Sequence, residues 1–450
     1  MQVILLNRYH RAAMARFTAV GSLLVAAAGC SWSDTIEVVD PDVISPGSLA
    51  SPAAASSLRN GVVLRLAQAT SGGENVFLLG GLLADEWRSG DTFEQRNTTD
   101  QRTLIAENTF LAPAFRAPMR VYVEAQTAIA VSRQFQPTPR SNIGLVFALG
   151  GYAANLIGEH FCNGIPYSSV VDGRVVDGMP EPFDNSFVRA IAYADSALRE
   201  VSGPAADSAR VVHLAALVRG RALVNRGQFA AAAAAVAAVP TSFVYQSFHS
   251  ANSTTNQNWG LNSNSRRYVL SDLEGRNGLP FRTANDPRIR TIVGTGTRRL
   301  AFDTETPFSE TTNFAQFGPV TLLSGIEARL IEAEAALRAG NATQMLSILN
   351  TLRTSAVGGI AGLSPLTDPG AESGRVDLVM RERAFWMFGT GHRLGDLRRL
   401  VRQYNRPIES VYPTGMFHKG GGAYGTMAVL PISFDERNNK NFTDCTDLRP

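Results

Sequence analysis

The segment 376–401, VDLVMRERAFWMFGTGHRLGDLRRLV, holds two carboxylates among many arginines. Glu382 and Asp396 could be the acid and base of a hydrolase, because glycoside hydrolysis needs two positioned carboxyl groups. They could instead belong to a structural ion-pair cluster made of Glu382, Arg383, Arg393, Asp396 and Arg399. We favour the structural interpretation, because nearby arginines lower the pKa of a carboxyl group, whereas a general acid needs a raised one.

Two helices must position these side chains. Apolar residues recur near helical spacing over 376–388, which predicts a long, largely buried helix. Gly389 and Gly391 end that helix, and residues 392–400 are expected to form a second, shorter one. Within the second helix Asp396 lies three residues from Arg393 and from Arg399, so each pair shares a face.

A second group of residues suits the recognition of a sugar. The stretch 247–265 is rich in Asn, Ser and Thr, and aromatic residues lie within it and beside it. Aromatic rings stack on the apolar faces of sugars, while amide groups bond the hydroxyls. The candidate ligand-binding residues are Tyr245, Phe248, Asn256, Asn258 and Trp259. The alternative is an irregular loop whose Trp259 fills a gap in the scaffold.

Sequence motifs for other chemistries are absent. The chain has no G-x-x-x-x-G-K-[ST] phosphate loop, no H-E-x-x-H zinc helix and no G-x-S-x-G nucleophile elbow. Its histidines are dispersed, and neither Cys162 nor Cys445 has a Cys or His neighbour at ligand spacing. We therefore expect no metal, no cofactor and no catalytic residue.

The composition of the chain limits its partners. The 450 residues are 44% hydrophobic, which is enough to bury a large core. The formal net charge is +3, and three arginines before residue 30, with no acid among them, account for all of it. The other arginines are scattered and form no basic stripe, so we expect no nucleic-acid partner.

The N-terminal residues resemble the signal of a bacterial lipoprotein. Basic residues precede an apolar run, 17–29, that is too short for the roughly 20 residues of a membrane-spanning helix. The run leads into the sequence AAGC, which is similar to a lipobox, so residues 1–29 would be removed and Cys30 acylated. Ser31 then favours the outer membrane by the usual sorting rule. A plain secreted protein cleaved at the same place is the alternative, and the true start could be Met1 or Met14.

Two cysteines remain once Cys30 is acylated. Cys162 and Cys445 would lie in a compartment that permits disulfides, and we predict that they pair. The denatured, unreduced protein should then contain no free thiol.

The rest of the chain is predicted to form one mostly α-helical domain. Prolines in 30–52 indicate an extended tether between the lipid and the domain. Small residues, a glycine turn and a second helix make 213–239 and 326–353 typical of tetratricopeptide helix pairs. We expect such pairs to form a right-handed superhelical scaffold, with few short strands. The expected parts of 53–450 are helical repeats at about 53–239 and 321–401, a loop-rich insert at about 240–320, and a C-terminal loop segment at 402–450.

Several of these segments resemble the SusD/RagB family of outer-membrane lipoproteins, which capture nutrients, usually glycans. The run from Glu382 to Arg399 is similar to the family's "ER … EG.R..DL.R" segment, although Thr390 stands where the family usually has Glu. Other similar segments follow in the family's order. They are DPR at 286–288, the glutamate- and alanine-rich run 327–341, NTLR at 350–353 and LPI at 430–432.

The resemblance implies a non-catalytic capture protein. Such a protein would bind an oligosaccharide or another oligomeric nutrient and pass it to a SusC-like TonB-dependent transporter. Its N-terminal lipid would hold it on the outer membrane, exposed at the cell surface. Two other classes remain open: a surface glycoside hydrolase, which would release products from a glycan, and a tetratricopeptide scaffold for envelope assembly, which would bind proteins without a transporter or glycan.

Overall fold

The computed structural model describes residues 49–171, 174–201, 205–360 and 362–450. The signal 1–29, the lipidation site Cys30 and most of the expected tether lie outside the described residues. The first described helix begins with Ser51 as its N-cap, whose hydroxyl accepts a hydrogen bond from the Ala54 N–H at 3.1 Å. Pro52 follows in the first turn, where a missing N–H costs no helical hydrogen bond.

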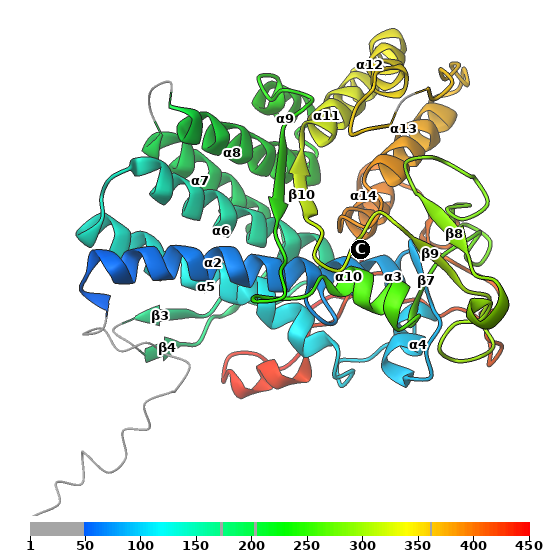
Figure 1. The fold of residues 1–450 in the computed structure, drawn as a ribbon, viewed down its shortest axis with the longest axis horizontal. Helices are drawn as coiled ribbons and strands as arrows, with labels where there is room; N and C mark the ends of the chain where they lie inside the picture. Colours follow the sequence, from blue (N-terminus) through cyan, green and yellow to red (C-terminus); the bar gives the residue numbers. More distant parts are fainter. Residues whose placement is uncertain (1–48, 172–173, 202–204, 361) are drawn as a thin grey trace, which may run out of the picture. The chain divides into compact units, whose positions relative to one another are not determined.

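Helices make up about half of the described chain, and those adjacent in sequence pack on one another. Helix α5 packs on α2, α6 on α5, α7 on α6, and α8 on α7 (Figure 1). Helix α6 is long and apolar enough to cross a membrane, but most of its residues are buried among α5, α7 and α8, as in a core helix. The helices are α2 (Pro52–Ser71), α3 (Val76–Leu83), α4 (Glu94–Asp100), α5 (Leu111–Phe135), α6 (Arg140–His160), α7 (Asp184–Glu200), α8 (Ala206–Asn225), α9 (Phe229–Val236), α10 (Gln257–Trp259), α11 (Gly325–Arg338), α12 (Ala342–Thr354), α13 (Glu372–Trp386), α14 (Arg393–Tyr404) and α15 (Ile408–Val411).

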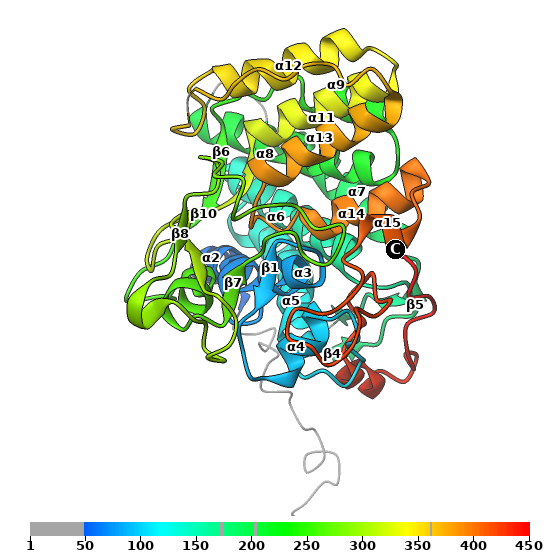
Figure 2. The same ribbon diagram turned by 90° about the vertical axis from the view of Figure 1, so that its right-hand side faces the viewer.

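The two predicted tetratricopeptide-like pairs are α8–α9 and α11–α12. Each pair turns at a glycine with positive φ, Gly227 at 71° and Gly340 at 73°, a conformation that other residues adopt at a cost. Helix α9 also packs directly on α11, so the two pairs are neighbours in space although the insert separates them in sequence (Figure 2). The mostly α fold built from helix pairs is thereby confirmed.

The insert leaves and rejoins the helical layers through a two-stranded stem. Strand β6 (Val244–Ser247) pairs antiparallel with β10 (Val320–Ser324), and Ser247 lies opposite Val320 (Figure 1). Beyond the stem the insert is irregular, with a short π-helix at Gly260–Asn264 and a 3-10 turn at Gly296–Arg298.

The other strands of the described residues are also short and paired in twos. Helix α3 ends at Leu83, and strand β1 begins four residues later at Trp87, which pairs with Leu270. The antiparallel pairs are β1 (Trp87–Ser89) with β7 (Tyr268–Leu270), β2 (Ile165–Pro166) with β5 (Pro180–Glu181), β3 (Ser169–Val171) with β4 (Arg174–Val176), and β8 (Thr291–Val293) with β9 (Ser309–Thr311).

The C-terminal segment is more ordered than the loop expected over 402–450. It contains the end of α14, helix α15 and a 3-10 turn at Phe434–Asn438. It returns to the end of α6, where a disulfide joins Cys162 to Cys445 with their Cα atoms 5.9 Å apart. The two cysteines expected to pair are thus bonded across 283 residues of sequence.

Candidate functional site

Glu382 lies in α13 with 1% of its surface exposed, and distant residues neutralise it. Arg288 Nη1 donates to its Oε2 at 2.6 Å, and Arg353 Nη1 donates to its Oε1 at 2.7 Å. Arg288 also pairs with Asp286, and its guanidinium stacks 5.1 Å from the ring centroid of Phe385. Glu382 therefore ties the insert and α12 to α13.

Asp396 has two arginine partners close in sequence. Arg383 donates to its two carboxylate oxygens at 3.0 Å each, and Arg399 Nη2 donates at 2.6 Å. Arg399 also bonds Glu334 of α11. Burial by itself would raise the pKa of Asp396, but the charges of Arg383 and Arg399 outweigh burial and hold the pKa well below its usual range. Asp396 is therefore ionised at neutral pH, the opposite of what a general acid requires.

Arg393 belongs to neither of these networks. Its Nε and Nη2 donate to the two oxygens of Asp85 at 2.5 and 2.8 Å. The single cluster expected from the sequence is therefore corrected to three networks, centred on Glu382, Asp396 and Asp85. The physical reason is that α13 and α14 contact several elements, and the acids and arginines of those elements complete the pairs instead.

No space for a substrate opens beside Asp396 in the described residues. The cavity there has a volume of about 10 Å³, which is room for one water molecule. Its polar lining includes Glu159, Arg221 and Asn225, which bond one another. The arrangement favours the structural interpretation of Glu382 and Asp396 over an acid and base pair.

Glu86 is a carboxyl group with the raised pKa of a general acid, and the sequence analysis did not single it out for that. Burial raises its pKa to about 8. Its Oε1 accepts a hydrogen bond from the Gly389 N–H at 3.0 Å, while Oε2 has no partner among the described residues. The side chain is fully buried beside Trp87 and Gly81, out of reach of a substrate. Glu86 therefore serves the packing of α3 against the α13–α14 junction.

The five candidate ligand residues do not form one surface. Tyr245 is buried in β6, and Asn256 and Asn258 are buried at the start of α10. The Asn258 Oδ1 accepts from the Asn75 Nδ2 at 2.9 Å, and the Asn256 Nδ2 donates to the Ala315 carbonyl at 3.3 Å. These three side chains are corrected to structural roles, because their polar groups bond inside the protein or are removed from solvent.

The other two candidates keep surface available to a ligand, and a further aromatic residue joins them. Phe248 is 68% exposed and Trp259 is half-buried. The register of the stem places Phe248 and Phe317 on its two chains, just beyond its open end, and Phe317 is 45% exposed. The N–H of 256 donates to the carbonyl of 316 at 3.0 Å, which brings the Trp259 segment to the same end. We call Phe248, Trp259 and Phe317 the stem-end aromatics.

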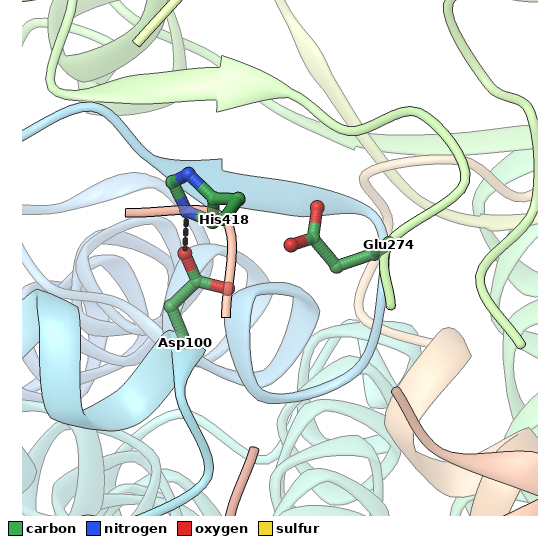
Figure 3. A group of neighbouring side chains, drawn as sticks. All are labelled: Asp100, Glu274 and His418. Carbon is green, nitrogen blue, oxygen red and sulfur yellow. Dashed lines mark hydrogen bonds and ion pairs between the residues drawn. The ribbon is translucent and has the colours of Figure 1, made fainter. Parts of the chain in front are cut away.

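A titratable cluster lies elsewhere, on three segments that are distant in sequence (Figure 3). His418 Nε2 lies 2.9 Å from Asp100 Oδ2, and a ligand atom each from Asp100, Glu274 and His418 lie within 4.8 Å of one another. These donors are of the kind that zinc accepts. Glu274, however, already accepts hydrogen bonds from Arg88, at 2.6 Å, and from Tyr424. A cation would compete with the Arg88 guanidinium. These residues therefore fit a hydrogen-bonded contact that holds the glycine-rich loop around 420 better than they fit a metal site.

Comparisons with known proteins agree with this architecture. No protein-family model matches the chain, and no curated protein matches it in sequence. Solved structures match it closely in fold. A SusD-like carbohydrate binding protein from Bacteroides fragilis NCTC 9343 has a TM-score of 0.64 at 11% identity, covering 88% of this chain and 99% of that one.

Two further structures give the same result. A SusD superfamily protein from Bacteroides thetaiotaomicron VPI-5482 has a TM-score of 0.61 at 14% identity over 88% of this chain and all of that one. A SusD-like carbohydrate binding protein from Bacteroides vulgatus ATCC 8482 has a TM-score of 0.62 at 12% identity, covering 87% and 97%. The molecule is thus a helix-pair scaffold with an irregular insert. More particularly, its fold is that of the SusD superfamily, as the resemblance in the sequence implied.

Proposed function

We propose that this protein is a non-catalytic, cell-surface binding protein for a glycan or another oligomeric nutrient, which it passes to a SusC-like TonB-dependent transporter. The main support is that nearly the whole described chain shares its fold with SusD-like carbohydrate binding proteins. The pairing of Glu382 and Asp396 with arginines adds support, because it disfavours these two carboxyl groups as the acid and base of a hydrolase.

The stem-end aromatics are the proposed sugar contact. Exposed rings at the stem end offer apolar faces on which sugar C–H groups stack, and polar groups of the loop can bond the hydroxyls. Phe248 has the largest exposed fraction of the three, and it packs on no described aromatic ring, which leaves its face free for a ligand. A fold that other carbohydrate-binding proteins share says nothing by itself of which sugar is bound.

Titration calorimetry against a panel of oligosaccharides tests this proposal. Phe248→Ala and Phe317→Ala should each weaken binding of the glycan found by about fivefold, since one stacked ring contributes on the order of 1 kcal/mol. Phe434→Ala is the matched control, because Phe434 is 39% exposed on the C-terminal 3-10 turn, and it should leave binding unchanged. Equal weakening of binding by all three variants would show that the glycan contact does not lie at the stem end.

The same panel separates capture from hydrolysis. Chromatography after long incubation should find each glycan intact. Release of shorter products by the wild type, lost in a Glu or Asp variant, would replace the proposal with a surface glycoside hydrolase.

The anchor and the transporter are proposed from the N-terminal sequence and the resemblance. Cys30→Ala should move the protein from the outer-membrane fraction to the soluble fraction without altering the described fold. Affinity purification of the lipidated protein should recover a TonB-dependent transporter. Recovery of envelope-assembly proteins alone would favour the scaffold alternative.

A further inference from the structure

Two arginines of α14 share one aromatic ring and have no acid between them. The guanidinium carbons of Arg398 and Arg402 lie 4.8 and 4.6 Å from the ring centroid of Phe183, which precedes α7. Arg398 is fully buried, whereas Arg402 and Phe183 are half-buried at the edge of the molecule. Two like charges on one ring repel each other, and in a low-dielectric setting the repulsion is weakly screened.

The hydrogen bonds of this pair are incomplete. Arg398 Nη1 donates to the carbonyl of Gly158 in the last turn of α6, at 2.8 Å. Its Nε and Nη2 have no partner among the described residues, and neither has the buried Nε of Arg402. An unsatisfied buried donor costs about 1–3 kcal/mol, and more when it is charged. The arrangement is therefore unfavourable unless something else accepts these N–H groups.

The nearest acids are already used. Asp184, which faces Arg402, accepts from Arg226 at 3.0 Å, and Glu159, which faces Arg398, accepts from Arg221. Tyr412, a further ionisable neighbour of both arginines, is neutral at physiological pH, because burial holds its pKa well above the usual range.

The other buried arginines of the described chain have more partners, although Arg96, Arg102, Arg221 and Arg383 each also have one nitrogen without a partner. Arg102 donates to two backbone carbonyls, those of Pro413 and Met427. The rest each contact at least one carboxylate; they are Arg96, Arg221, Arg288, Arg383, Arg393 and Arg399. Arg398 differs from all of them in having two unpartnered nitrogens and no carboxylate contact.

The electrostatics of the pair favour the binding of an anion. Burial lowers the pKa of Arg398 to about 10, and burial with the charges of Arg398 and Arg399 lowers that of Arg402 to about 9. Both guanidinium groups are nonetheless mostly protonated at pH 7. Helix α7 begins beside them and directs the positive end of its dipole toward the same place.

We propose that Arg398 and Arg402 together bind one oxyanionic group, a sulfate, phosphate or carboxylate, at the edge of Phe183. Guanidinium forks match the oxygen spacing of such groups and bind them by paired N–H···O bonds. The group could come from a free inorganic ion or from an acidic sugar residue. The inference goes beyond the proposed function, because it requires neither the stem-end aromatics nor a glycan.

Titration calorimetry on the folded chain in a low-salt buffer tests it, with sodium sulfate, sodium glucuronate and neutral glucose as ligands. The wild type should bind sulfate saturably with one site per chain, and glucose should not compete. Arg402→Gln should weaken sulfate binding at least tenfold. Arg338→Gln is the matched control, because Arg338 also stacks on two rings, Phe229 at 5.1 Å and Tyr404 at 5.0 Å, and it should bind sulfate as the wild type does.

Each result of the titrations either supports or overturns the proposed anion site. Competition by glucuronate identifies an acidic sugar as a possible source of the group, and sulfate binding alone identifies an inorganic ion; both support the site. Absence of saturable sulfate binding to the wild type, or equal binding by Arg402→Gln, overturns it. If circular dichroism shows Arg402→Gln to be unfolded, Arg402→Lys replaces it: Lys retains the charge but loses the fork, so unchanged affinity in that variant would also overturn the proposal.

Discussion

Helix α14 buries arginines on two faces in opposite ways. On one face Arg399 contacts Asp396 and Glu334, so charge is balanced inside the protein. On the other face Arg398 and Arg402 stack on Phe183 with no carboxylate partner among the described residues. Residues 398 and 399 differ by about 100° around the helix, which is enough to place them in different surroundings. The contrast teaches that the structural role of an arginine here depends on what the neighbouring helices supply, and it motivates the anion proposed for Arg398 and Arg402.

Removing Arg399 should have the largest effect on this contrast. Arg399→Met leaves Glu334 buried with Tyr404 and the more distant Arg383 as its remaining partners, and we expect the free energy of unfolding to fall by about 3–5 kcal/mol. Urea denaturation followed by circular dichroism measures it. Arg406→Met is the control, since Arg406 pairs with the exposed Asp377, and it should cost at most about 0.5 kcal/mol. Equal losses would mean that the buried network does not stabilise the fold.

Glu86 extends the comparison to an unpaired acid. Its folded pKa of about 8 lies above the ordinary value of 4.5, so its contribution to stability is full below about pH 4.5 and is lost as the pH rises to 8. Glu86→Gln should therefore be more stable than the wild type at pH 8, by roughly 4 kcal/mol, and the difference should shrink toward pH 4.5. Chemical denaturation at several pH values measures the difference. A constant difference over this range would contradict the raised pKa.

Removing Arg398 should have a much smaller effect than removing Arg399, one residue away. Arg398→Met deletes an uncompensated buried charge together with one bond to Gly158, and these effects offset each other. In buffer without sulfate or phosphate, unfolding free energies of mutant and wild type should agree within about 1 kcal/mol. A loss as large as that of Arg399→Met would show that Arg398 is satisfied within the chain.

The smallest effect on stability is expected at the stem end. Phe248→Ala removes an exposed ring, so the free energy of unfolding should stay within about 0.5 kcal/mol of the wild-type value while glycan binding falls. Differential scanning fluorimetry beside the calorimetry separates the two quantities. Loss of stability and binding together would indicate that Phe248 packs against the fold.

Features with a local signal were predictable from the sequence. Gly227 and Gly340 marked the turns of the two helix pairs, and the three-residue spacing of Asp396 and Arg399 predicted their contact. Cys162 and Cys445 were paired by elimination. In each case the rule depends on spacing along the chain or on residue type alone.

Contacts made between distant segments were not predictable in this way. The partners of Glu382 come from 288 and 353, and the partner of Arg393 comes from 85, so charge near them in sequence was a poor guide. The polar composition of the insert was a poor guide to ligand contacts for the same reason. Asn256 and Asn258 look like ligand contacts in a polar loop, but their side-chain amides bond Thr70 of α2, the α3 N-cap Asn75 and the carbonyl of 315.

The stem of β6 and β10 separates two kinds of sequence constraint. Much of the stretch between them is held by the rest of the chain, because Leu270 pairs with Trp87, Glu274 bonds Arg88 and Arg288 bonds Glu382. Phe248 and Phe317, next to the stem, are instead exposed. Substitutions at these two positions can therefore alter recognition while the bonds that fasten the insert to the helices are retained.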